Sequence, residues 1–153
     1  MNKVLLKTIK GKKNFDSVFS NKKVFSSKKL IAIVNFKKEE DSFSDRQNKE
    51  DKIISYAVLA SKKLSKKAVV RNRVKRLLRE SIKKVLNESI DNPYIFENIV
   101  LSWKEKLPHH PKLIKFTEVM LSLSEVLNKA YQYYITKEKE GLEADSIAIN
   151  QGL

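Results

Sequence analysis

The stretch Lys67-Ala-Val-Val-Arg-Asn-Arg-Val-Lys-Arg-Leu-Leu-Arg-Glu80 predicts a long amphipathic helix over about 68–90. At 100° per residue, one arc of about 100° collects the residues expected to face a core: Val70, Val74, Leu77, Leu78, Ser81 and Val85. The opposite side carries Arg71, Asn72, Lys75, Arg76, Arg79 and Lys83. Ile82 and Leu86 interrupt this basic side, and Asp91-Asn92-Pro93 predicts the end of the helix.

Arginine is used unevenly along the chain. Apart from Arg46, every arginine lies between Arg71 and Arg79, and lysine supplies the positive charge elsewhere. The guanidinium group can grip a phosphate with two hydrogen bonds, whereas lysine acts as a point charge. The helix therefore has the side chains of a phosphate-binding surface, although a merely solvated face is the simpler alternative.

Composition bounds the possible functions. The chain has 153 residues, no cysteine, a net charge of +14 and 41% hydrophobic residues. Disulfides and cysteine chemistry are excluded, one domain with a core is expected, and a polyanion is the expected partner. The sequence holds no uninterrupted apolar run of about 18 residues, so no membrane span is predicted.

Hydrophobic patterning outside the helix predicts an α+β domain. A short helix is expected at 14–20, capped by Asn14, and Phe15, Val18 and Phe19 share one of its faces. Buried strands are expected at 30–36, 53–60 and 98–103, with room for a short strand at 23–26, and a last helix is expected at 115–135. A polar loop is expected at 37–52. The domain is expected to span 1–136, followed by a flexible tail at 137–153.

The residues offer little for autonomous catalysis. The basic helix contains only Glu80 and Glu88 as acids, about 12 Å apart along the axis and too far to share a metal ion. His109 and His110 are neighbours between two prolines, which is typical of a surface turn. We therefore predict no catalytic residue and no metal ligand in the protein, and a chain that binds nucleic acid without cutting it.

The arginine string resembles the signature helix of the bacterial ribonuclease P protein component, R-N-R-x-K-R-x-x-R. The resemblance extends to Ser61-Lys62-Lys63, which is similar to the family's S-K-K run, and to the stretch from Asn14 to Phe19, which is similar to its D-F-x-x-V-F helix. It covers about 10–135.

This resemblance implies a two-layer αβββαβα sandwich with a left-handed βαβ crossover, although such crossovers are usually right-handed. It also implies a protein subunit of a ribonucleoprotein endoribonuclease, which assists a catalytic RNA in removing the 5′ leader of precursor tRNA in the cytoplasm. Mg²⁺ is then held mainly by the RNA subunit and none by the protein alone. The implied partners are that RNA and precursor tRNA, with no membrane and no DNA.

The resemblance also implies roles for individual residues. The positions that match the RNA-subunit signature and its basic flank are Lys62, Lys63, Arg71, Asn72, Arg73, Lys75, Arg76 and Arg79. Phe15 and Phe19 match aromatic residues of a leader-binding cleft, whose opposing strand holds Ile33. From the residues alone, the two rings can either stack on bases or pack on the sheet.

Several positions depart from the family pattern. Ile33 stands where relatives often have an aromatic residue, and Trp103 where they commonly have arginine, although Lys104 follows it. A glycine usual near Ser65 is absent. The loops 37–52 and 105–114 look longer than usual.

Three alternatives remain at this point. Another basic RNA-binding protein, such as a ribosomal protein, would have a similar composition and architecture. A DNA-binding protein would need a short helix before the basic one, where the sequence predicts a strand. A membrane-surface module would need aromatic anchors that the apolar arc of 68–90 lacks.

Overall fold

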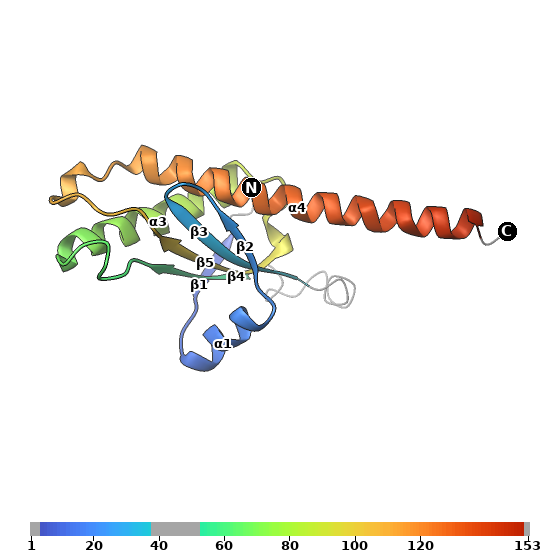
Figure 1. The fold of residues 1–153 in the computed structure, drawn as a ribbon, viewed down its shortest axis with the longest axis horizontal. Coiled ribbons are helices and arrows are strands. Elements are labelled where there is room, and N and C mark those ends of the chain that lie inside the picture. The colour runs from blue at the N-terminus through green and yellow to red at the C-terminus, as the bar shows by residue number, and fades with distance from the viewer. Residues whose placement is uncertain (1–3, 38–52, 152–153) are drawn as a thin grey trace.

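The computed structural model describes residues 4–37 and 53–151, with side chains up to residue 138. The first half contains β1 (Leu5–Thr8), α1 (Lys12–Ser20), β2 (Lys23–Ser26), β3 (Leu30–Phe36) and β4 (Ile53–Leu59). The second half contains α3 (Ala68–Glu88), β5 (Phe96–Trp103) and α4 (Phe116–Gln151), with 3₁₀ turns at Pro93–Ile95 and Pro111–Leu113. Figure 1 shows their arrangement.

The strands form one mixed sheet in the order β1-β4-β5-β3-β2. β3 pairs antiparallel with β2 and β5, whereas β4 is parallel to both β1 and β5. β4, α3 and β5 therefore form the predicted βαβ unit, and the α+β class is confirmed. The left hand of the crossover stays a prediction.

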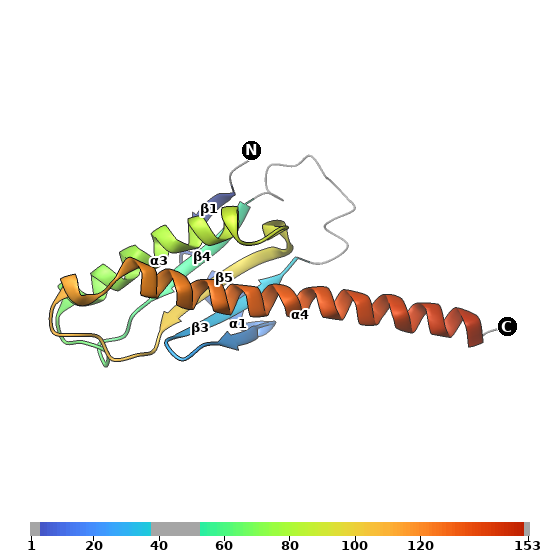
Figure 2. The ribbon, with the colours of Figure 1, turned by 90° about the horizontal axis from the view of Figure 1, so that it is seen from above.

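The main core lies between the sheet and the pair α3 and α4, which run side by side over one face (Figure 2). Alternate residues of the central strands point into it, among them Leu30, Ala32 and Val34 of β3. The predicted stripe of α3 from Val70 to Val85 is buried against these strands and α4. Burial of this apolar stripe stabilises the segment from residue 68 onward as a helix packed on the sheet.

Among the described elements, α1 covers part of the opposite face of the sheet (Figure 1). A second, smaller core forms there from Ile9, Val18, Ala57 and Val100, with Phe15 and Ile33 packed against it. α1 begins earlier than predicted, because Gly11 adopts a φ of 88° at the N-cap position. Asn14 is thus inside the helix, and its Nδ2 donates to the carbonyl of Lys10 at 2.7 Å.

Three expectations differ from the structure. β1 was not predicted. Ile82 and Leu86 do not interrupt a solvent face, because both are fully buried. Val4, just before β1, belongs to the same core, and its amide donates to Asn87 Oδ1 of α3 at 2.8 Å. The last helix continues to Gln151 rather than ending near 135, since 136–151 contains no proline and is rich in good helix formers.

Two regions fall outside these comparisons. Apart from Lys37, the predicted loop 37–52 lies outside the described residues. The C-terminal part of α4 projects beyond the sheet (Figures 1 and 2), while the flexibility expected for 137–153 stays a prediction. No helix in the described ranges is long and apolar enough to cross a membrane.

Candidate nucleic-acid interface

The exposed side of α3 carries the centre of the predicted RNA-binding surface. Asn72, Arg76 and Arg79 are exposed, and each lies on the side of the helix away from the buried stripe. Arg76 Nε is 3.8 Å from Glu80 Oε1, one turn further on. Because both side chains are more than half exposed, this pair is weak and leaves the guanidinium available to a phosphate.

The other signature residues lie on the two flanks of α3. Arg71 and Lys75 are half-buried on one flank. Arg73 is half-buried on the other, where its Nη2 donates to the carbonyl of Ile114 at 3.4 Å. Among the described residues, the Nε atoms of Arg71 and Arg73 are buried without a hydrogen-bond partner. The structure therefore divides the signature into an exposed group and two flanking groups held against the fold.

The turn between β4 and α3 adds further positive charge. Lys62 and Lys63 are exposed there, as predicted, while Leu64 between them and α3 is buried. Lys67 Nζ donates to the carbonyl of His109 at 3.1 Å, a contact that the sequence did not indicate. It ties the N-terminal end of α3 to the loop that follows β5.

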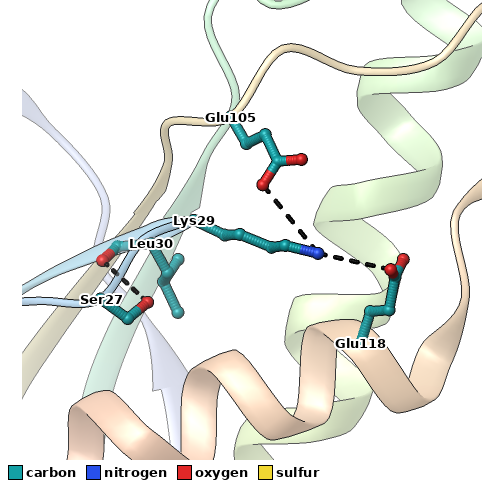
Figure 3. Close-up of polar contacts among 5 residues, drawn as sticks. All are labelled: Ser27, Lys29, Leu30, Glu105 and Glu118. Atoms are coloured by element: carbon teal, nitrogen blue, oxygen red, sulfur yellow. Dashed lines mark hydrogen bonds and ion pairs between the residues drawn. The ribbon is translucent and has the colours of Figure 1, made fainter.

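That loop is anchored on its other side by Lys29 (Figure 3). Lys29 Nζ lies 3.3 Å from Glu118 Oε1 in the first turn of α4 and 3.9 Å from Glu105 Oε2. The amide of Lys104 donates to the Lys29 carbonyl at 2.9 Å. The loop that touches Lys67 and Arg73 is therefore fixed to the β2–β3 turn and to α4.

His109 and His110 serve this loop as a surface turn, as predicted. Both are exposed, and His110 Nδ1 accepts a hydrogen bond from the amide of Lys112 at 3.1 Å. In the part of the chain that the structure describes, no three His, Asp or Glu side chains are grouped so that they could hold a metal ion.

The second predicted surface lies between α1 and the sheet. Phe19 is 38% exposed, with Lys22 Nζ 5.9 Å from its ring centre. Phe15 and Ile33 are half-buried and pack against the smaller core. The two rings thus differ: Phe15 contributes mainly to packing, whereas Phe19 has a face open to a base.

Sequence reasoning missed Val24, which extends this surface. Val24 pairs with Ile33 across β2 and β3, so the two side chains lie on the same face of the sheet. Its side chain is 54% exposed, which is unusual for valine in a strand. The alternation of Lys23-Val24-Phe25-Ser26 was the available signal. We use the name aromatic cleft for the leader-binding cleft that the resemblance implies, and mean by it Phe19, Val24 and Ile33.

Trp103 does not belong to either surface. It is only 6% exposed and packs in the main core, next to Leu30 across β3 and β5. The departure from arginine at this position therefore removes a charge and adds to the core, while Lys104 remains exposed.

Comparisons with known proteins show the family and the fold. The sequence matches the family model of Ribonuclease P over residues 6–131. The RNase P protein of Staphylococcus aureus has a similar structure, with 20% identity, coverage of 80% of this chain and 94% of that chain, and a TM-score of 0.56. The RNase P protein from Thermotoga maritima gives 19% identity, coverage of 82% and 96%, and a TM-score of 0.56. No curated protein matches the sequence significantly.

Proposed function

The chain belongs to the ribonuclease P protein family, and from this premise we propose how its surfaces are divided between two RNAs. It is the protein component of the ribonucleoprotein enzyme ribonuclease P. This component binds RNA, and the enzyme processes tRNA. The exposed group of α3 and its flanks bind the RNA subunit. The aromatic cleft binds the 5′ leader of precursor tRNA.

The observation that carries this division is the arrangement of α3. Asn72, Arg76 and Arg79 are exposed on the side away from a fully buried stripe, so the helix is held by one side while the other offers guanidinium groups to phosphates. Lys62 and Lys63 continue the positive surface beyond the N-terminal end of the helix. A rigid cationic face of this kind suits a folded RNA, whose phosphates hold fixed positions.

The aromatic cleft suits a single strand instead. The exposed ring of Phe19 beside Lys22, with Val24 and Ile33 on the face of the sheet that α1 covers in part, supplies a stacking surface and a cation for the backbone. Precursor tRNA carries a single-stranded leader and mature tRNA does not, so binding at this cleft distinguishes the substrate from the product.

The chemistry of cleavage is proposed to lie in the RNA subunit, which holds most of the Mg²⁺, with none bound by the protein alone. The signature side chains of α3 are guanidinium, ammonium and amide groups, of which the cations repel Mg²⁺, and the neighbouring carboxylate of Glu80 is paired with Arg76. They assist by offsetting phosphate repulsion between the two RNAs. We place this activity in the cytoplasm, where precursor tRNA is made, with no membrane or DNA partner.

Reconstitution tests the proposal. Adding the chain to a bacterial ribonuclease P RNA should lower the Mg²⁺ concentration needed to cleave precursor tRNA, because its cations replace part of the metal-ion screening. The chain alone should cleave nothing. Cleavage by RNA-free protein that persists through repurification would contradict the proposal, as would a chain that leaves the Mg²⁺ requirement unchanged.

Replacing Arg76 with alanine should weaken binding to the RNA subunit without destabilising the fold. One phosphate contact is lost, so the slope of log affinity against log salt should fall by up to about 1. Filter binding over a salt series measures the slope, and thermal unfolding checks the fold. Arg73→Ala should affect both measurements, since Arg73 also bonds to the Ile114 carbonyl.

Replacing Phe19 with alanine should weaken holoenzyme binding to precursor tRNA by about 1–3 kcal/mol, the cost of one stacked base, while binding to mature tRNA stays unchanged. Competition between the two tRNAs measures the difference. Phe15→Ala serves as a comparison and should mainly lower the melting temperature, because Phe15 packs on the smaller core. Equal losses for both tRNAs in Phe19→Ala would remove the leader from this cleft.

A further inference from the structure

The side of α1 opposite the aromatic cleft is polar. Taking Val18 as the centre of the buried face, 100° per residue places Asn14 and Ser17 on one flank and Phe15 and Phe19 on the other. A separate pocket of about 550 Å³ lies on the polar flank, lined by Lys7, Thr8, Ile9, Lys10, Asn14, Ser17, Ser55 and Asn98. α1 thus divides this face of the sheet into two different surfaces.

A row of polar residues forms the floor of this pocket. Lys7 of β1 pairs with Ser55 of β4, and Ser55 pairs with Asn98 of β5. The row continues outside the pocket lining with Asn35 of β3, which pairs with Asn98. In the neighbouring row on the same face, Ala57 and Val100 are apolar and sit beneath α1. The polar row exists in this form because β1 adds Lys7 at the edge of the sheet.

Hydrogen bonds fix the orientation of two asparagine side-chain amides in this row. Asn35 Nδ2 donates to the carbonyls of Val18 at 3.0 Å and Asn21 at 3.1 Å, both of which can only accept. Asn35 Oδ1 must therefore face Asn98, and it accepts from Asn98 Nδ2 at 3.0 Å. Asn98 Oδ1 is then left free to accept a hydrogen bond. The C-terminal end of α1 thus sets which atom Asn98 offers.

The pocket has the chemistry of a nucleotide site. Lys7 and Lys10 are exposed cations at its rim, and none of its described lining residues is acidic. Ser17 and Ser55 offer hydroxyl groups, and Asn98 offers a fixed acceptor. An acceptor suits the exocyclic amine of adenine, cytosine or guanine, and the ring N–H of uracil is a weaker match because it lies between two carbonyl groups.

We propose that this pocket binds one unpaired nucleotide of RNA, with Lys7 and Lys10 at its phosphate and Asn98 Oδ1 accepting from its base amine. The inference rests on the proposed function, because it assumes an RNA-bound holoenzyme. Two sources share this chemistry: a leader nucleotide of precursor tRNA beyond the aromatic cleft, and an unpaired nucleotide of the RNA subunit.

Site-directed crosslinking distinguishes these sources, and the absence of cysteine from the chain permits a single labelled position. Ser17→Cys, carrying a photoreactive group, is assembled with the RNA subunit and precursor tRNA, one RNA radiolabelled at a time. Ser20→Cys is the matched control, since Ser20 is on the same helix, exposed and outside the pocket. We expect several-fold more crosslinking from position 17, and the labelled RNA identifies the source.

A charge test and a base test accompany it. Lys7→Met should lower the salt slope of holoenzyme binding to that RNA by about 0.7, the value for one single-strand phosphate, whereas Lys28→Met, an exposed lysine at the β2–β3 turn, should not. Replacing the crosslinked nucleotide by its analogue without the exocyclic amine should weaken binding about two- to tenfold, the range for one hydrogen bond.

The outcomes separate this inference from the proposed function. If wild-type protein fails to lower the Mg²⁺ requirement, both fall together. If the wild-type holoenzyme is active but positions 17 and 20 crosslink equally, the pocket is not an RNA site and only the inference is overturned. Equal salt slopes for Lys7→Met and Lys28→Met would overturn it as well, and unchanged binding of the analogue without the amine would overturn the role of Asn98.

Discussion

Replacing Trp103 with alanine should lower the free energy of unfolding by about 3–5 kcal/mol, the range for removing a large aromatic side chain from a core. Trp103 is 6% exposed and packs with the buried residues between the sheet and α4. The fold cannot fill a space of this size by small adjustments. Denaturant unfolding, followed by circular dichroism, measures the loss.

Lys104→Ala is the control for this prediction. Lys104 is the next residue and is exposed, so its removal should leave the unfolding free energy almost unchanged. RNA affinity of Trp103→Ala, measured at a temperature where the variant is folded, should match that of the wild type. If Trp103→Ala keeps its stability and loses RNA affinity, position 103 contacts RNA, as an arginine there would.

The parts of the fold that sequence predicts well are those whose pattern is long and local. The helix at 68–90 and the strands at 30–36 and 53–60 all have apolar periods that leave one interpretation, and the structure contains them as α3, β3 and β4. β1 has no such pattern. Its four residues, Leu5–Thr8, become a strand only because β4, far along the chain, offers a parallel edge.

The limits at α3 and α4 have the same origin. Ile82 and Leu86 lie on the basic side of an isolated helical wheel, but the segment before β1 widens the buried arc at that end of α3. The end of α4 was placed where the apolar period fades, near 135. Helix propensity continues the helix beyond the last residues that pack on the sheet.

For the binding surfaces, sequence indicated which residue types are present and the structure shows how exposed each is. Arg71, Arg73 and Arg76 look equivalent in the signature, yet of these three only Arg76 is exposed. Phe15 and Phe19 look equivalent in the short helix, yet only Phe19 is exposed. The Asn35–Asn98 pair could not be foreseen, because it depends on the register between β3 and β5.

Replacing Leu77 with alanine should destabilise the fold by about 2–5 kcal/mol, whereas Arg76→Ala, one residue away, should not. Leu77 is 2% exposed within the main core, whereas Arg76, about 100° around the helix from it, lies outside the buried stripe with its side chain 62% exposed. Thermal unfolding should therefore show a loss for Leu77→Ala only, and RNA-subunit binding should show a loss for Arg76→Ala only.

This pair tests the orientation of α3 directly. Leucine and arginine have similar helix propensities, so their replacement by alanine changes the helix itself to a similar extent. The two positions differ in that Leu77 is buried and Arg76 is exposed. Leu77→Ala, assayed well below its melting temperature, should bind the RNA subunit with the wild-type salt slope. Arg76→Ala should melt like the wild type and bind with the smaller slope. The reverse result, an early-melting Arg76→Ala with intact RNA affinity, would mean that the basic side is buried and that the RNA-binding face of this protein lies elsewhere.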